Sequence, residues 1–177
     1  GEYFKSHPEY FCERNGFRES YQPCLANPEA RRIMKENLLR HIAEKYPKIK
    51  YFTVSQNDNG FYCTCPKCKA LDDREGTPAA SILDFVNEAA DAVKEKYPDV
   101  IIAFGGHNVK PDGSDLDEIP EADIIMHGEG ETVFKDLLLA LSESRPYSSV
   151  CGVSFRENGS VVTTPAGETA DIASFPS

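Results

Sequence analysis

The stretch Glu44-Lys45-Tyr46-Pro47-Lys48-Ile49 recurs 51 residues later as Glu95-Lys96-Tyr97-Pro98-Asp99-Val100. In both copies a helical pattern ends and an apolar, strand-like run begins. Because proline disfavours helical backbone in the residue before it, we expect helices to end at Tyr46 and Tyr97. The repeat therefore predicts two successive helix–strand units.

Further helix and strand signals extend this pattern along the chain. Asn27-Pro28 and Thr77-Pro78 each place a capping side chain before a proline that suits the first helical position, and a third helix is expected after Gly130. Hairpins with Asn-Gly turns are expected at Phe11–Ser20 and Cys151–Thr163. The expected strands are Tyr21–Leu25, Tyr51–Ser55, Val100–Phe104 and Asp123–Met126.

The order of these elements predicts an α/β fold. Val100–Phe104 and Ile124–Met126 are continuous apolar runs, as in strands that helices cover on both sides. Right-handed crossovers then give a mainly parallel sheet with helices on both faces, in a single domain over residues 1–177. A half (β/α) barrel is the alternative, because 177 residues fall well short of the roughly 250 of a complete barrel.

The charge of the chain limits its partners. The net charge of −10 argues against a nucleic-acid backbone or an anionic membrane as the main partner. No apolar run approaches the roughly 20 residues that span a bilayer, and we find no targeting segment. The sequence therefore predicts a soluble protein that can take a small-molecule ligand, and it leaves compartment and oligomeric state open.

Cys63-Thr64-Cys65-Pro66-Lys67-Cys68 is the sharpest local motif. Its three sulfurs can be directed at one point, and tetrahedral zinc takes four thiolate or imidazole ligands. Cys24 is the preferred fourth ligand, because we expect it at the end of a strand that neighbours the strand before the motif; Cys12 and His7 are weaker candidates. The alternatives are an iron–sulfur cluster and free or disulfide-linked thiols.

Polar loops follow three of the expected strands, where parallel α/β sheets bind their ligands. The loops are Gln56–Gly60, Gly105–Asn108 and His127–Glu131. Paired glycines let a backbone approach a ligand closely, and His107 can titrate or coordinate, although ordinary turns are the alternative for each loop. Asp58 and Glu131 are weak candidates for the acid and base of a glycosidase, which needs carboxyls about 5–10 Å apart.

Four stretches of the N-terminal half occur in the order of a known family: His7–Phe11, Cys24–Glu29, Ser55–Gly60 and Cys63–Cys68. Residues from about 7 to 98 resemble an uncharacterised bacterial domain family associated with glycoside-hydrolase-like barrels. The resemblance implies a (β/α) barrel with these loops at its carboxyl face. It also implies a carbohydrate-related setting, without an established reaction.

The C-terminal half carries a second set of matching stretches: Tyr97–Ile102, Phe104–His107, Ala122–Thr132 and Val150–Phe155. Residues from about 92 to 177 resemble the cobalamin-binding domain that precedes radical-SAM catalytic domains. The resemblance implies a flavodoxin-like sheet whose loops cradle the cofactor's lower face. The family's D-x-H-x-x-G motif is absent here, so a histidine ligand to cobalt is not implied. The residues implied for the cradle are Gly105, Gly106, His107, Gly128, Glu129 and Gly130.

Two resemblances in one chain suggest recombination, natural or engineered, with a junction near residues 85–100. The sequence as a whole therefore predicts a flavodoxin-like module that binds cobalamin or a related ligand, or that has lost its ligand. We expect no catalysis from this chain alone. The alternative is a fragment of a carbohydrate-active, glycoside-hydrolase-like enzyme.

Overall fold

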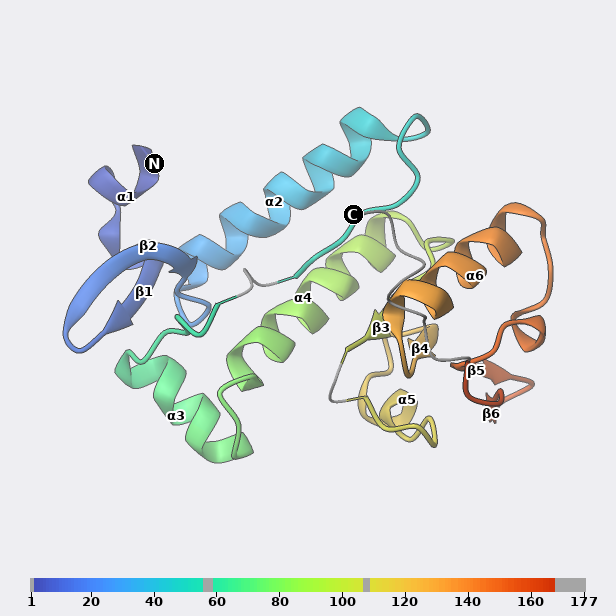
Figure 1. Ribbon diagram of the computed structural model, residues 1–177. Helices are drawn as coiled ribbons and strands as arrows, with labels where there is room; N and C mark the ends of the chain where they lie inside the picture. The colour runs from blue at the N-terminus through green and yellow to red at the C-terminus, as the bar shows by residue number, and fades with distance from the viewer. Residues whose placement is uncertain (1, 56–58, 107–108, 168–177) are drawn as a thin grey trace, which may run out of the picture. The chain divides into compact units, whose positions relative to one another are not determined.

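The computed structural model describes residues 2–55, 59–106 and 109–167 (Figure 1). The chain divides into two compact units, residues 1–96 and 97–177. Among the described residues, no helix is both long and apolar enough to cross a membrane. The N-terminal unit contains α1 (Glu2–Ser6), a 3-10 turn (Pro8–Tyr10), β1 (Phe11–Arg14), β2 (Phe17–Pro23), α2 (Pro28–Lys45), α3 (Pro66–Glu75) and α4 (Ala80–Lys96).

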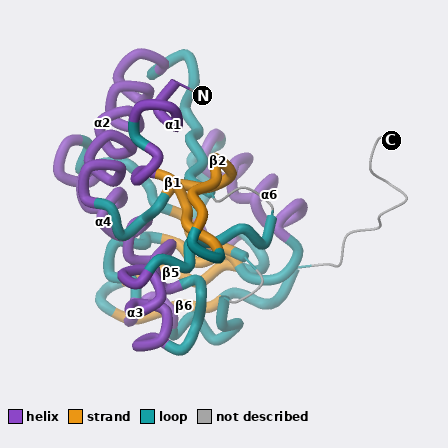
Figure 2. The backbone as a smooth tube through the Cα atoms, turned by 90° about the vertical axis from the view of Figure 1, so that its left-hand side faces the viewer, coloured by secondary structure: helices purple, strands orange, loops and turns teal. Residues whose placement is uncertain are grey.

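The first hairpin forms as the sequence predicts. β1 and β2 are antiparallel, and Arg14 pairs with Phe17 across the turn. Asn15 and Gly16 have φ angles of 51° and 82°, the left-handed backbone that a two-residue turn of this type requires. Figure 2 shows the hairpin in orange. The residues expected as a strand from Tyr21 thus belong largely to β2, and they pair within a hairpin.

The long helices of this unit also follow their capping signals. The Asn27 side chain accepts hydrogen bonds from the backbone N–H groups of Glu29 and Ala30, both at 3.0 Å, and α2 ends before Tyr46 as predicted. α4 ends at Lys96 as predicted, but it begins at Ala80, a little after the expected Thr77-Pro78. Arg31 on α2 pairs with Asp84 on α4 at 2.5 Å, which ties these two neighbouring helices together.

The prediction is wrong for the segment between α2 and α4. Residues 50–55 belong to no sheet in the described part of the chain, although a strand was expected at Tyr51–Ser55. Tyr51 and Val54 are 48% and 45% exposed, so this apolar run is not a covered strand. β-propensity reports only a fit to a pleated, half-buried surface, and no partner strand supplies that surface here. The same segment also contains the helix α3.

The C-terminal unit contains a sheet in the order β3-β4-β5-β6. β3 and β4 are parallel, whereas β4–β5 and β5–β6 are antiparallel, so the mainly parallel sheet predicted for the chain is wrong. The two-residue Asn158-Gly159 turn makes β5 and β6 antiparallel, as its hairpin signal indicates. The elements are β3 (Ala103–Gly105), α5 (Asp115–Glu118), β4 (Ile124–Met126), α6 (Gly130–Ser142), a 3-10 turn (Tyr147–Ser149), β5 (Val153–Glu157) and β6 (Ser160–Thr163).

Helices lie on both faces of this sheet. Successive residues of a strand point to opposite faces, and Ile124 packs with Val133 and Leu137 of α6. Its neighbour Ile125 packs with Leu116 of α5. The α/β character is therefore confirmed for this unit, while the flavodoxin-like arrangement stays a prediction.

Candidate metal centre

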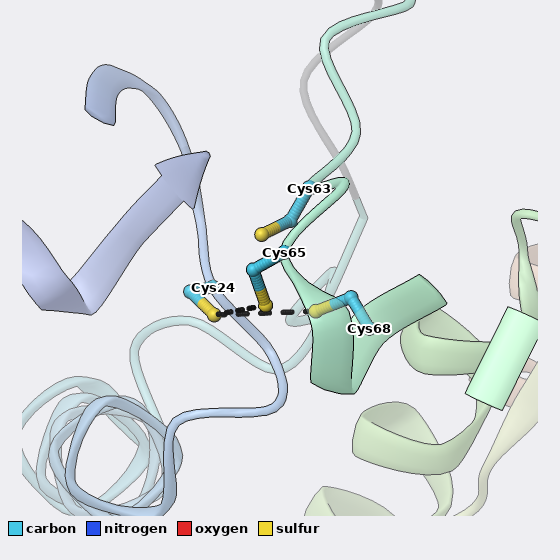
Figure 3. A group of neighbouring side chains, drawn as sticks. All are labelled: Cys24, Cys63, Cys65 and Cys68. Carbon is cyan, nitrogen blue, oxygen red and sulfur yellow. Dashed lines mark hydrogen bonds between the residues drawn. The ribbon is translucent and has the colours of Figure 1, made fainter. Parts of the chain in front are cut away.

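Four cysteine side chains converge in the N-terminal unit (Figure 3). The sulfurs of Cys24, Cys63, Cys65 and Cys68 all lie within 4.8 Å of one another, and all four residues are buried. The Cys24 sulfur is 3.7 Å from that of Cys65 and 3.9 Å from that of Cys68. The structure thus brings together the four residues that the sequence predicts as ligands.

Cys24 is held at the junction between β2 and α2. Its backbone N–H donates to the Tyr10 carbonyl at 2.8 Å, and its carbonyl accepts from the Asn27 N–H at 3.0 Å. Asn27 is itself the N-cap of α2. The thiol is therefore fixed by a turn between two regular elements.

The Cys63–Cys65 segment is fixed against the hairpin. The Thr64 N–H and hydroxyl both donate to the Glu13 carbonyl, at 2.7 and 2.9 Å. The Glu13 N–H in turn donates to the Cys63 sulfur at 3.3 Å. Glu13 lies on β1, so hydrogen bonds to this strand hold the Cys63–Cys65 segment in place, although strand and segment are about 50 residues apart in the sequence.

The start of α3 places the other two thiols. Cys65 is the N-cap residue, Pro66 opens the helix, and Cys68 lies in its first turn. Residues three apart share one face of a helix, which directs both thiols to the same side. The expected reason for this convergence, two adjacent parallel strands, is wrong: a hairpin and a helix N-terminus bring the cysteines together.

The other thiol and the histidine considered as fourth ligands lie outside this group. Cys12 is fully buried against the cluster, but its thiol donates to the Glu19 carbonyl at 3.3 Å. His7 stacks on Tyr10, and its Nδ1 contacts Glu9 at 3.2 Å. Among the described residues the candidate ligand set is therefore composed of four thiols.

The thiols influence one another's ionisation. Hydrogen bonds from the Cys63 and Cys68 thiols lower the pKa of Cys24. The hydrogen bond to Cys24 raises the pKa of Cys68, and burial raises it further. Cys24 is therefore the first of this pair to become a thiolate, the form that binds a metal.

The spacing of the sulfurs matches a single ion. Zinc–thiolate bonds of about 2.3 Å in a tetrahedron place the sulfurs about 3.8 Å apart. The two short contacts at Cys24, 3.7 and 3.9 Å, bracket that value. A multinuclear iron–sulfur cluster must fit several ions and sulfides between its cysteines and needs a wider cage. The four cysteines could therefore hold one metal ion.

The glycine loops predicted as a cofactor cradle lie in the C-terminal unit. Gly105 ends β3 and the Gly128–Gly130 loop follows β4, so the parallel pairing places both loops at one edge. Gly106 and Gly128 have φ angles of 141° and 86°. A Cβ atom added at Gly106, Gly128 or Gly130 would meet nothing within 4 Å. Glu129 is the N-cap residue of α6 and makes no capping hydrogen bond within the described chain, and His107 lies outside the described residues.

One of the two carboxylates considered for acid–base catalysis lies outside the described residues. Glu131 lies in the first turn of α6, in the C-terminal unit. Asp58 is the carboxylate that the structure does not describe. A glycosidase-type carboxylate pair stays a prediction.

Sequence reasoning missed a row of hydrogen-bonded polar side chains beside β4, which runs from the buried His127 and Ser154 to the exposed Thr163. His127 Nε2 and Ser154 Oγ are 2.8 Å apart, and Ser154 Oγ is 2.8 Å from Thr163 Oγ1. Burial lowers the pKa of His127. No sequence motif marks these three side chains, because they lie on different segments and meet only through the pairing of β4, β5 and β6.

Several curated proteins share part of this sequence. The cobalamin-dependent radical SAM methyltransferase TokK of Streptomyces tokunonensis is 41% identical over 81 residues, 44% of this chain and 12% of that protein. The 2-(S-pantetheinyl)-carbapenam-3-carboxylate methyltransferase of Streptantibioticus cattleyicolor is 38% identical over 78 residues, 42% of this chain and 11% of that protein. An uncharacterised methyltransferase of Pyrococcus horikoshii, PH0819, is 36% identical over 91 residues, 50% of this chain and 20% of that protein.

The chain thus covers at most a fifth of the length of these three relatives. A protein family matches a larger part of the chain, residues 1–111, which includes all four cysteines of the metal centre. The chain belongs to this family, which is described as a domain of unknown function, DUF4838.

Proposed function

We propose that Cys24, Cys63, Cys65 and Cys68 bind one zinc ion and that this ion is structural. Four thiolates complete a tetrahedral shell. A catalytic zinc requires an open position for water or substrate, and this site would have none. All four ligands are buried, which fits a closed site. The ion would join the turn after β2 to the start of α3.

One observation carries this proposal. Within residues 59–75, all of which the structure describes, the buried residues are Cys63, Cys65 and Cys68 and no others. Phe61 stacks on Tyr21, with ring centroids 4.8 Å apart, but it stays 37% exposed. Apolar packing alone therefore gives this segment little core, whereas metal-binding free energy becomes folding free energy for the segment that the metal ties down.

Metal analysis of the purified protein tests the zinc site. We expect about one zinc ion per chain, and its loss in Cys65→Ser together with a lower melting temperature. Cys12→Ser is the matched control, because Cys12 is equally buried beside the cluster but lies outside the ligand group. Metal-free protein with six titratable thiols, or with disulfides among these cysteines, would contradict the proposal. Bound iron in place of zinc would support the four-thiolate site and contradict only the identity of its metal.

For the C-terminal unit we propose a binding module related to cobalamin-binding domains. One relative supports this: TokK, which is 41% identical over 81 residues, is named as a cobalamin-dependent radical SAM methyltransferase. Gly106, Gly128 and Gly130 lie at one edge of the β3–β4 pair, where a backbone without side chains lets a ligand approach closely. Bound cobalamin would supply methyl-transfer chemistry. The residues of this chain would only contact one face of the cofactor.

Titration with hydroxocobalamin, followed by its visible spectrum and by co-elution, tests the module. We expect binding that Gly128→Ala weakens, because the added methyl group would stand between the backbone and the ligand. Gly159→Ala is the matched control: Gly159 also has a positive φ, 80°, and open space, but it lies in the β5–β6 turn. Failure of the parent protein to bind, or turnover of chromogenic glycosides, would favour the carbohydrate-active alternative or a module without a ligand.

A further inference from the structure

Two sulfur–sulfur contacts of the metal centre join Cys24 to the start of α3. Its sulfur lies 3.7 Å from that of Cys65 and 3.9 Å from that of Cys68, and all four sulfurs lie within 4.8 Å of one another. A disulfide requires about 2.05 Å, so the Cys24–Cys65 pair must close by about 1.7 Å. Both contacts join segments about 40 residues apart, because Cys24 follows β2 and the other two cysteines open α3.

Backbone position distinguishes Cys65 from Cys68 as a partner of Cys24. Cys68 lies within the first turn of α3, so the helix fixes its backbone. Cys65 precedes the helix and has extended dihedrals of −61° and 156°. Its side chain can therefore approach Cys24 without unwinding α3, and the Cys24–Cys65 pair is the one that the geometry favours.

We propose that the metal centre is a redox switch, an inference that rests on the proposed zinc site. A peroxide would oxidise Cys24 and Cys65 to a disulfide, and the zinc ion would be released. Zinc holds buried cysteines as thiolates, the reactive form of sulfur. One of the two thiolates attacks a peroxide oxygen, the O–O bond breaks, and a sulfenic acid and hydroxide form. The second thiolate attacks the sulfenic sulfur, the S–S bond forms, and a second hydroxide leaves. Two electrons pass from sulfur to peroxide, and two protons convert the hydroxides to water.

The disulfide would connect the same two segments of the fold that the zinc ion connected before oxidation. After oxidation the ion retains only Cys63 and Cys68, half of its ligands, and is released. The new bond still joins the turn after β2 to the start of α3, the same two segments that the ion held. Oxidised, metal-free protein therefore melts at a higher temperature than reduced, metal-free protein.

The experiment uses the full chain with Cys151→Ser, which removes the exposed thiol outside the cluster. Zinc content is measured first, and hydrogen peroxide is then added while a chromogenic chelator reports released zinc. Trypsin separates the key thiols by sequence: Cys24 falls in Glu19–Arg31, Cys65 in Tyr51–Lys67, and Cys68 in the fragment after Lys67. Fragmentation of the cross-linked peptides then distinguishes Cys65 from Cys63.

We expect release of about one zinc ion per chain, with Glu19–Arg31 linked to Tyr51–Lys67 through Cys65 and a melting temperature above that of chelated, reduced protein. Cys12→Ser in the same background should behave identically. Zinc that stays bound, a Cys65–Cys68 disulfide, or an oxidised protein that melts no higher than the reduced metal-free form overturns this inference and leaves the zinc site standing. Protein without zinc at the outset overturns both.

Discussion

The cysteine cluster of the N-terminal unit and the sheet core of the C-terminal unit are both buried, but they are built from different side chains. The first consists of Cys12, Cys24, Cys63, Cys65 and Cys68. The second consists of Ile124, Val133, Leu137, Ala140, Val150, Val153 and Phe155. Small thiols bury little apolar surface, whereas aliphatic side chains each contribute about 1.5–3 kcal/mol on burial. The difference leads us to expect that the first core depends on the proposed metal ion and that the second is stabilised by apolar burial.

Removal of the metal should produce the largest contrast between the two cores. A strong chelator should abolish amide protection in residues 11–24 and 59–75, because the cysteines are the only buried side chains of the second segment. A thousandfold excess of free zinc over its dissociation constant corresponds to about 4 kcal/mol of stabilisation. Hydrogen exchange followed by mass spectrometry checks this prediction. Equal loss of protection in residues 124–155 would remove the distinction between the cores.

Truncation of an aliphatic core residue should reverse the contrast. Leu137 is 1% exposed and packs in the C-terminal core, so Leu137→Ala should cost about 3 kcal/mol through lost burial and a cavity. Leu139→Ala is the matched control on the same helix, because Leu139 is 42% exposed. Denaturant unfolding measures the cost. Zinc content should stay unchanged in both variants, and its loss would show that the two cores depend on each other.

Acidification should destabilise the C-terminal unit by a smaller amount. Burial lowers the pKa of His127 in the folded state, so the unfolded chain binds a proton first as the pH falls. Stability is therefore complete above about pH 6.5 and declines below it, by at most about 1.4 kcal/mol per pH unit. His127→Gln should flatten this slope, whereas His41→Gln, at an exposed position, should not. Unfolding curves between pH 7 and pH 5 decide; an unchanged slope in His127→Gln contradicts the assignment.

Local signals in the sequence predicted the local structure well. The Asn15-Gly16 and Asn158-Gly159 turns, the Asn27 cap and the helix ends before Tyr46 and Tyr97 all form as expected. Each of these features depends on neighbouring residues, through a positive φ angle, a capping side chain or a proline. The mainly parallel sheet failed, because strand direction depends on partners far along the chain.

The cysteine cluster shows both sides of this limit. The sequence by itself singled out Cys63, Cys65 and Cys68, because thiols clustered in six residues have few structural uses other than metal binding or disulfides. It favoured Cys24 over Cys12 and His7 as the fourth ligand, but for a reason that the structure does not support. Only the tertiary structure decided how the four cysteines meet. The Glu13 carbonyl on β1 accepts a hydrogen bond from the Thr64 N–H, and the start of α3 directs Cys65 and Cys68 toward Cys24. Ligand chemistry is a property of residue type, whereas the convergence of distant segments depends on backbone hydrogen bonds that no local pattern encodes.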